Sequence, residues 1–78
     1  MINRKYHESI CHEFPRRLQM LRKRENKSQV VLSQLCGLTD TAITRYEGGK
    51  NKPTVDSLLA IADYFHVSTD FLLGRTNY

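Results

Sequence analysis

The chain has 78 residues, 40% of them hydrophobic and 26% charged, which is the composition of one small globular domain. No apolar run approaches the roughly 20 residues that span a bilayer, and residues 1–14 lack the apolar segment of a signal peptide. We therefore expect a cytoplasmic protein that makes no contact with a membrane.

The formal net charge of +4 is spread unevenly along the chain. Residues 15–52 carry nine Lys or Arg against three acidic residues, whereas residues 53–78 carry one Arg against three Asp. This distribution favours a polyanion as the partner of the middle of the chain. The alternative is a basic face that is merely solvated.

Cysteine, histidine and carboxylate spacings give little sign of catalysis or of metal binding. Cys11 and Cys36 are too few for a disulfide framework, and we expect Cys36 to be a small buried apolar residue. His7, Cys11 and His12 lie close together, but no second pair of zinc ligands follows them. Because no nucleophile with a matching base and no paired carboxylates occur at useful spacing, we expect no enzyme, no cofactor, no metal and no small-molecule substrate.

The first helix is predicted to begin at Pro15, which fits the first turn of a helix, and to run to about Glu25. We expect residues 1–13 to form an N-terminal arm or a short extra helix, and residues 14–78 to form the main domain. Ser28 is a candidate N-cap for a second helix that ends near Cys36. The residues expected to face inward from these two helices are Leu18, Leu21, Val31, Leu32 and Leu35, with Met20 as a further candidate.

Three further helices follow, and Gly and Pro mark their limits. Thr39 is the predicted N-cap of the third helix, over residues 40–47, and Pro53-Thr54 starts the fourth. Val67-Ser68 caps a short fifth helix that Gly74 stops. No strand pattern competes, so the chain is predicted to be all-α, a compact bundle of five short helices. The fifth helix carries Phe71, Leu72 and Leu73. The expected inward residues of the third and fourth helices are Ala42, Ile43, Tyr46, Val55, Leu58, Leu59, Ala62 and Phe65.

Residues 28–47 fit two helices joined by a short turn that contains a glycine, the arrangement of a helix-turn-helix motif. Gly37 supplies the positive φ that the turn requires, and Ser33 is small enough for a close helix crossing. Ile43 and Tyr46 anchor the third helix in the core. Its outer face is short and polar, as entry into a groove demands, and consists of Asp40, Thr41, Thr44 and Arg45.

The sequence SQVVLSQLCGLTDTAITRYEGGKNKPTVDSLLAIADYFHVSTDFLLGR resembles the phage Cro and repressor type of helix-turn-helix domain, a lambda-repressor-like fold found in bacteria and their mobile elements. The similarity covers about residues 14–75. It depends on Gln29, Gly37 and Ile43 together with the segments RYEGGKNKP and VSTDFLLGR. The resemblance implies a DNA-binding regulator at the bacterial nucleoid, whose third helix lies in the major groove.

The resemblance also implies roles for individual residues. The base-facing candidates are Thr39, Asp40, Thr41, Thr44 and Arg45, and the phosphate-contacting candidates are Ser28, Gln29, Lys50, Asn51 and Lys52. Gln29 is also expected to brace the third helix, and Arg22 to form an ion pair with Glu47. The candidates for a dimer interface are Phe71, Leu72, Arg75 and Tyr78, with core packing as the alternative for Phe71 and Leu72.

Several of these roles have open alternatives. The guanidinium of Arg45 fits the O6 and N7 edge of guanine, but it can equally hold a phosphate or simply be solvated. Thr41 and Thr44 can contact a thymine methyl group, a phosphate, or only solvent. Asp40 either accepts a hydrogen bond from cytosine or favours the positive end of the helix dipole, and we prefer the dipole. Tyr46 is expected in the core.

The predicted function is sequence-specific binding of double-stranded DNA by a transcriptional regulator, with repression as the family expectation. One recognition helix gives limited affinity, so we expect a homodimer on a near-palindromic site, with recognition helices about 34 Å apart. The alternative is a protein-interaction module of the same fold, such as an antitoxin-like or phage-encoded partner. Lys50 and Lys52 discriminate the two, because their removal weakens only DNA binding.

Overall fold

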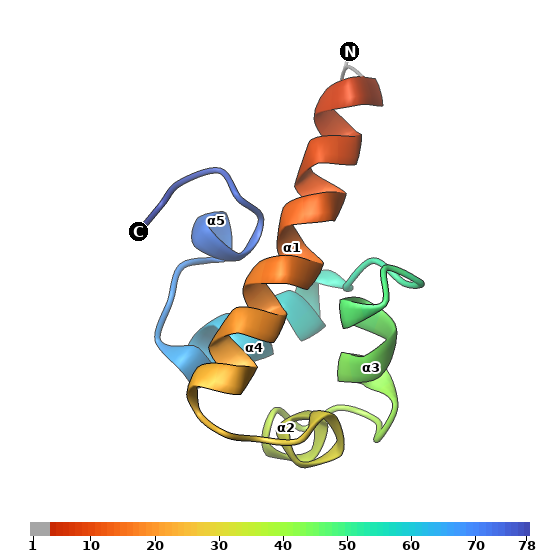
Figure 1. The fold of residues 1–78 in the computed structure, drawn as a ribbon, viewed down its shortest axis with the longest axis vertical. Coiled ribbons are helices and arrows are strands. Elements are labelled where there is room, and N and C mark those ends of the chain that lie inside the picture. Colours follow the sequence, from red (N-terminus) through yellow and green to blue (C-terminus); the bar gives the residue numbers. More distant parts are fainter. Residues whose placement is uncertain (1–3) are drawn as a thin grey trace.

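Five α-helices and their connections make up the computed structural model, which describes the backbone of residues 4–78 and the side chains of residues 12–78. The helices are α1 (Arg4–Arg24), α2 (Gln29–Leu35), α3 (Ala42–Glu47), α4 (Val55–Phe65) and α5 (Thr69–Leu72). No strand occurs in residues 4–78, and none of the helices is long and apolar enough to cross a bilayer over the described part of the chain. The predicted all-α fold of five helices is confirmed (Figure 1).

The predicted start of the first helix at Pro15 is wrong, because α1 begins at Arg4 and continues through Pro15. Pro15 removes one backbone donor from the helix interior, which normally favours a kink or an end. Phe14 and Leu18, on either side of this position, are both buried in the core and hold α1 in place there. The division of the chain at residue 13 into an arm and a domain stays a prediction.

The helix ends follow from local hydrogen-bonding groups. Ser28, Thr54 and Ser68 occupy N-cap positions, and each side-chain oxygen accepts a hydrogen bond from the backbone N–H three residues later. Gly37 lies in the left-handed region at φ +71°, where the Leu38 N–H reaches back to the Ser33 carbonyl at 2.8 Å. The turn between α2 and α3 is therefore closed as the sequence predicted.

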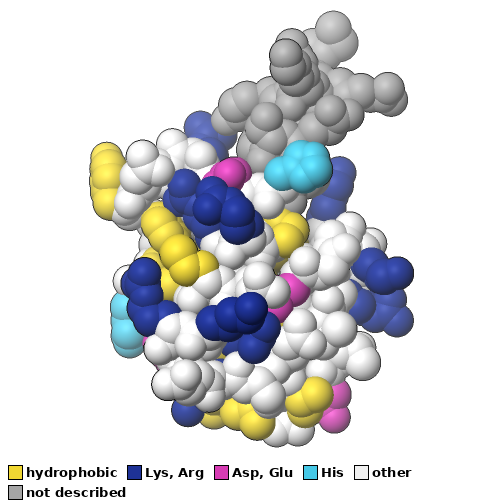
Figure 2. All heavy atoms as spheres, viewed as in Figure 1, with side chains coloured by type: hydrophobic (Ala, Val, Ile, Leu, Met, Phe, Trp, Pro, Cys, Tyr) yellow, Lys and Arg dark blue, Asp and Glu magenta, His cyan; other side chains and the backbone are white. Residues whose placement is uncertain are grey.

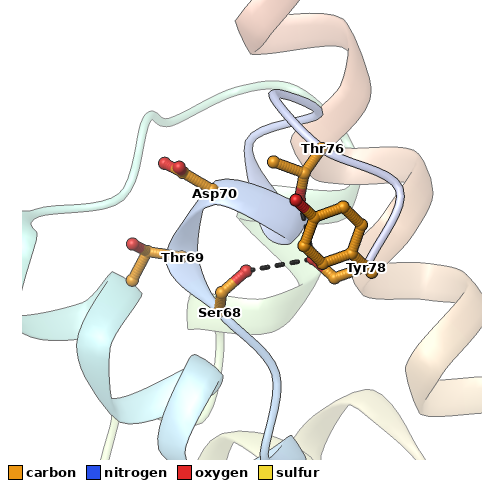
Figure 3. Close-up of a pocket in the computed structure, with 5 residues that line it drawn as sticks. All are labelled: Ser68, Thr69, Asp70, Thr76 and Tyr78. Carbon is orange, nitrogen blue, oxygen red and sulfur yellow. Dashed lines mark hydrogen bonds between the residues drawn. The ribbon is translucent and has the colours of Figure 1, made fainter.

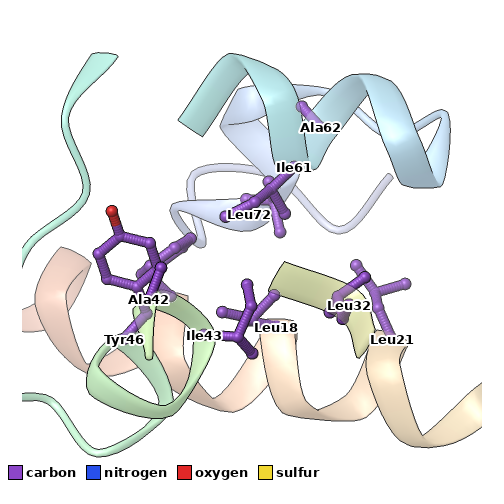
Figure 4. Packing of buried hydrophobic residues seen from close by; sticks show 10 residues of the cluster. Leu18, Leu21, Leu32, Ala42, Ile43, Tyr46, Ile61, Ala62 and Leu72 are labelled. Atoms are coloured by element: carbon purple, nitrogen blue, oxygen red, sulfur yellow. The ribbon is translucent and has the colours of Figure 1, made fainter. Parts of the chain in front are cut away.

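The core lies between α1 and the other four helices, as Figure 4 shows. The Phe14 and Tyr46 rings meet edge to face, with centroids 5.8 Å apart, and so join α1 to α3. Tyr46 is buried, as expected, and Cys36 is half-buried against the core, where burial raises the pKa of its thiol. The buried apolar residues are Phe14, Leu18, Leu21, Leu32, Ala42, Ile43, Tyr46, Ile61, Ala62 and Leu72.

Four residues that were expected to face inward are exposed instead, and so is Met20, the further candidate on α1, which is 38% exposed. Val31 and Leu35 on α2 are 42% and 51% exposed, and Val55 and Leu59 on α4 are 73% and 47% exposed. On α2 only Leu32 and Ser33 are buried, because this seven-residue helix meets the core along a narrow strip. On α4 the buried residues are Ile61 and Ala62. Ala62 was predicted to face inward, but Ile61 was not, so the inward face of α4 is centred closer to Ile61 than the sequence indicated.

Candidate nucleic-acid interface

Helices α2 and α3 cross at Ser33, whose side chain is fully buried. The Ser33 hydroxyl donates to the Gln29 carbonyl at 2.9 Å and accepts from the Ile43 backbone N–H at 3.1 Å. Ile43 belongs to the first turn of α3, where backbone donors have no partner within the helix. Ser33 therefore both allows the close crossing and supplies a hydrogen bond that fixes the start of α3.

The predicted N-cap of α3 is wrong, because the cap position is Thr41 rather than Thr39. The Thr41 side chain makes no cap hydrogen bond, and the Ala42 N–H instead reaches the Thr39 carbonyl at 3.0 Å in a tight turn. The side-chain acceptor for α3 comes from Ser33, on the neighbouring helix. As a result, the side chains of Thr39 and Thr41 are not used in capping α3.

A polar network ties α3 to α1 and α2. Arg22 donates to both carboxylate oxygens of Glu47, with Nε–Oε2 at 2.6 Å and Nη2–Oε1 at 2.9 Å. Gln29 Nε2 donates to Glu47 Oε1 at 3.0 Å, and the Thr44 hydroxyl donates to Gln29 Oε1 at 2.9 Å. The carboxylate hydrogen bond raises the pKa of Arg22 above its ordinary value. The expected ion pair is thus present, and Gln29 does brace α3.

The five base-facing candidates all lie on the exposed side of α3 and of the turn before it, and they are Thr39, Asp40, Thr41, Thr44 and Arg45. Arg45 makes no side-chain hydrogen bond or ion pair with any residue whose side chain the structure describes. Asp40 is held from α2, because Gln34 Nε2 donates to its carboxylate at 3.3 Å. The turn and α3 therefore present a guanidinium and three threonines to the outside.

The loop after α3 extends this surface with further basic side chains. Lys50, Asn51 and Lys52 are exposed, and Gly49 at φ +71° lets the chain turn sharply after the helix. Basic side chains stand at the edge of the molecule over this loop (Figure 2). Ser28 is exposed and its hydroxyl caps α2, while Gln29 beside it is half-buried. The phosphate-contacting candidates thus border the base-facing ones.

One of the four dimer-interface candidates is unavailable to a partner. Leu72 is fully buried in the chain's own core, so its assignment to an interface is wrong and the core-packing alternative holds. Phe71 is half-buried, packed against the core, and covered by the Arg17 guanidinium 4.5 Å from its ring centroid. Arg75 is exposed beside Asp70, and Tyr78 is 90% exposed.

The last residues are held to α1 by Arg17, which is buried. Arg17 Nη1 donates to the carbonyls of Phe71 at 2.8 Å and Thr76 at 2.6 Å, and Nη2 donates to Asn77 Oδ1 at 3.1 Å. Sequence reasoning counted Arg17 only as part of the basic charge. The burial of Arg17 could have been inferred from its position one residue before Leu18, since the apolar stem of a long side chain there can lie along the core.

The structure also has a hollow of about 470 Å³ between the start of α5 and the C-terminal segment (Figure 3). Its lining is small and polar, and the hydroxyls of Ser68 and Thr76 both donate to the Tyr78 carbonyl. Over residues 12–78 no three His, Cys, Asp or Glu side chains gather as metal ligands. His7 and Cys11 of the N-terminal cluster lie outside the described side chains.

Comparison with known proteins agrees with this geometry. A family profile described as helix-turn-helix matches residues 18–72. The cryptic phage CTXphi transcriptional repressor RstR of Vibrio cholerae is 39% identical over 59 residues, which are 76% of this chain and 53% of RstR. The HTH-type transcriptional activator BcrR of Enterococcus faecalis is 39% identical over 62 residues, 80% of this chain and 30% of BcrR. The chain thus spans about half, or less, of the length of these relatives.

A solved structure gives the same result for the fold. The P22 c2 repressor protein, crystallised in complex with a synthetic operator, superposes with a TM-score of 0.71 at 27% sequence identity. The match covers 76% of this chain and 89% of that one. Taken with the profile match over residues 18–72, this places the chain in the helix-turn-helix family.

Proposed function

We propose that this chain binds double-stranded DNA in a sequence-specific manner and regulates transcription, with α3 inserted in the major groove. The observation that carries the proposal is the contrast within one surface: α3 is fixed from behind by Arg22, Gln29 and Ser33, while Arg45 on its outer side has no partner among the described residues. A rigid helix that presents an uncommitted guanidinium and short side chains fits a groove about 12 Å wide.

The surface divides by chemistry into a part that reads bases and a part that holds the backbone. Arg45 is suited to the O6 and N7 acceptors of guanine, which a guanidinium can contact with two parallel hydrogen bonds. Lys50 and Lys52 are suited to phosphates, which fix the register of a protein on the duplex without reading its sequence. Each phosphate contact also releases counterions, so affinity falls with salt.

A homodimer completes the proposal, because one helix-turn-helix module buries too little surface for high specific affinity. Arg75 and Tyr78 are exposed at the C-terminal end and remain the proposed contacts, with the uncovered part of Phe71. Two copies would read half-sites about one helical turn apart. We propose repression by occlusion, since blocking a promoter needs only the DNA contacts, whereas activation also needs a contact with the transcription machinery.

Selection from a random double-stranded DNA pool at two salt concentrations tests this function. Retained sequences should contain a near-palindrome with half-sites about 10 base pairs apart. Changing Arg45 to Ala should alter the selected letters, whereas changing Lys52 to Ala should weaken binding without altering them. Recovery of no enriched sequence, with binding that vanishes uniformly in salt, would contradict the proposal and favour a protein partner.

A further inference from the structure

The contacts behind α3 determine whether the Thr44 hydroxyl donates or accepts its hydrogen bond with Gln29. The Glu47 carboxylate is paired with Arg22, and an ionised carboxylate only accepts hydrogen bonds. Gln29 lies 3.0 Å from that carboxylate, so its amide must turn the donor Nε2 toward Glu47. The acceptor Oε1 of the same amide then faces Thr44 at 2.9 Å. The Thr44 hydroxyl must therefore be the donor.

A threonine hydroxyl has one proton, and in this chain that proton is used inside the protein. What Thr44 can still offer to a ligand is a methyl group and the remaining acceptor capacity of its oxygen. Phosphate oxygens and the major-groove edge of guanine present acceptors only, N7 and O6 in the case of guanine. Neither can form a hydrogen bond with this oxygen. Adenine and cytosine present an amino donor from which this oxygen can accept a hydrogen bond, whereas thymine presents a C5 methyl group, which packs well against a threonine methyl.

We propose that Thr44 is a specificity-determining residue that favours thymine through its methyl group and excludes guanine at the base it faces. The inference rests on the proposed function, since it assumes that the exposed side of α3 meets bases. It goes further by naming the letter and the cause. The cause is the series of contacts from Arg22 through Glu47 and Gln29, which commits the hydroxyl proton before DNA arrives.

The test uses a matched pair of variants, because Thr44→Val keeps the methyl group without the hydroxyl and Thr44→Ser keeps the hydroxyl without the methyl. Selection on both variants and on the wild-type chain identifies the base that Thr44 faces as the position whose letter changes in Thr44→Ser. At that position we expect thymine with the wild-type chain. Replacing this thymine by deoxyuridine, which lacks only the methyl group, should weaken wild-type binding about fourfold, the effect of one buried methylene.

The two variants should then respond differently to deoxyuridine. Thr44→Val should keep the fourfold preference for thymine over deoxyuridine, and Thr44→Ser should lose it. A third variant, Gln29→Met, removes the acceptor of the Thr44 proton, so guanine should become tolerated at the same position even though overall affinity falls. In the double variant with Thr44→Val this gain of guanine should disappear, because no hydroxyl is left to donate.

Three results would overturn the inference while the proposed function stands. They are selection of guanine, adenine or cytosine instead of thymine by the wild-type chain at the position that depends on Thr44, an unchanged preference of Thr44→Ser for thymine over deoxyuridine at that position, and an enriched site in which no letter depends on Thr44. If no sequence is enriched at all, the proposed function fails first and the inference fails with it. The failure of each is therefore distinguishable in the same experiment.

Discussion

Two arginines on neighbouring helices show how differently this chain uses the same side chain. Arg22 on α1 is largely buried, and its guanidinium donates to the Glu47 carboxylate and to the Lys27 carbonyl. Arg45 on α3 is exposed and has no such partner in the described part of the chain. The first arginine is positioned to hold α3, and the second is carried by α3 toward the outside.

The difference indicates where stability and binding are separated in the molecule. Groups behind α3 are satisfied by one another, so their removal leaves buried partners without a hydrogen bond and costs folding free energy. Arg45 on the outer side of α3 has no partner in the described part of the chain, so its removal should cost binding and little else. The following substitutions test this separation, in order of decreasing expected effect on stability.

Changing Glu47 to Ala should have the largest effect. The Glu47 side chain is 3% exposed, and its loss leaves the Arg22 guanidinium and the Gln29 amide without their acceptor. Removing one partner of a buried pair costs about 3–5 kcal/mol, which a small domain can barely tolerate. Urea denaturation followed by circular dichroism measures the loss. The paired change of Arg22 to Met with Glu47 to Leu should restore the part of the stability that the unpaired guanidinium costs, although the Gln29 amide still lacks its acceptor. A double variant no more stable than Glu47→Ala would contradict the importance of the ion pair.

Changing Arg17 to Met should have an intermediate effect. The methionine keeps most of the apolar stem but removes the donors to the Phe71 and Thr76 carbonyls. Hydrogen bonds to a charged group are worth about 1.5–3 kcal/mol each, and water can replace part of them because the freed carbonyls lie beside the exposed last residues of the chain. We expect a loss of about 1–3 kcal/mol in the free energy of unfolding. Hydrogen exchange should report faster exchange in residues 74–78, and unchanged exchange there would contradict the anchoring role.

Changing Ser33 to Ala should have a smaller effect that bears on both sides of the separation. The Ile43 N–H loses its acceptor in a buried place, at a cost of about 1–2 kcal/mol. Because Ser33 fixes the start of α3, specific DNA affinity should fall more than non-specific affinity, measured at temperatures where the variant is fully folded. An equal fall of both affinities would show that Ser33 contributes to stability alone.

Changing Lys50 and Lys52 together to Ala should leave stability within about 0.5 kcal/mol of the wild type, as surface substitutions usually do. Both side chains are exposed on the loop after α3. If each holds one phosphate, the slope of log Kd against log salt should fall by about two. Fluorescence anisotropy titrations at salt concentrations between about 50 and 200 mM measure this slope. An unchanged slope would remove the loop from the interface.

Much of the fold was predictable because local chemistry marks its boundaries. Ser28, Thr54 and Ser68 are caps by residue type, and Gly37 adopts the positive φ that its place in the turn demands. The burial of Ile43 and Tyr46 followed from helical spacing. These features depend on residues close in the sequence, so a single sequence contains them.

The errors arose where distant contacts decide the outcome. Four of the seven residues of α2 are aliphatic, so spacing alone could not show that Leu32 would be buried while Val31 and Leu35 remain exposed. Likewise, Thr39 has the right side chain for an N-cap, but Ser33 on the preceding helix takes that role for α3. The helical start at Arg4 was missed because Pro15 is a common first helical residue and here lies inside α1.

The candidate site divides in the same way. The resemblance implied the Arg22–Glu47 pair and the bracing role of Gln29, and both contacts are present. The direction of the Thr44 hydroxyl was not predictable, because it depends on three residues from three helices acting in series. The base and phosphate roles of the exposed residues stay predictions.

The separation of stability from binding is tested most directly by changing Arg45 to Ala and measuring both quantities on one sample. The free energy of unfolding should stay within about 0.5 kcal/mol of the wild type, while affinity for the selected DNA site should fall about tenfold, as the loss of a guanine contact worth 1–3 kcal/mol requires. Arg16, an exposed arginine of α1 paired with Glu13, is the matched control, and its change to Ala should leave that affinity within about twofold. Unchanged affinity in Arg45→Ala, or a loss of folding free energy as large as the loss of binding free energy, would contradict the separation of stability from binding.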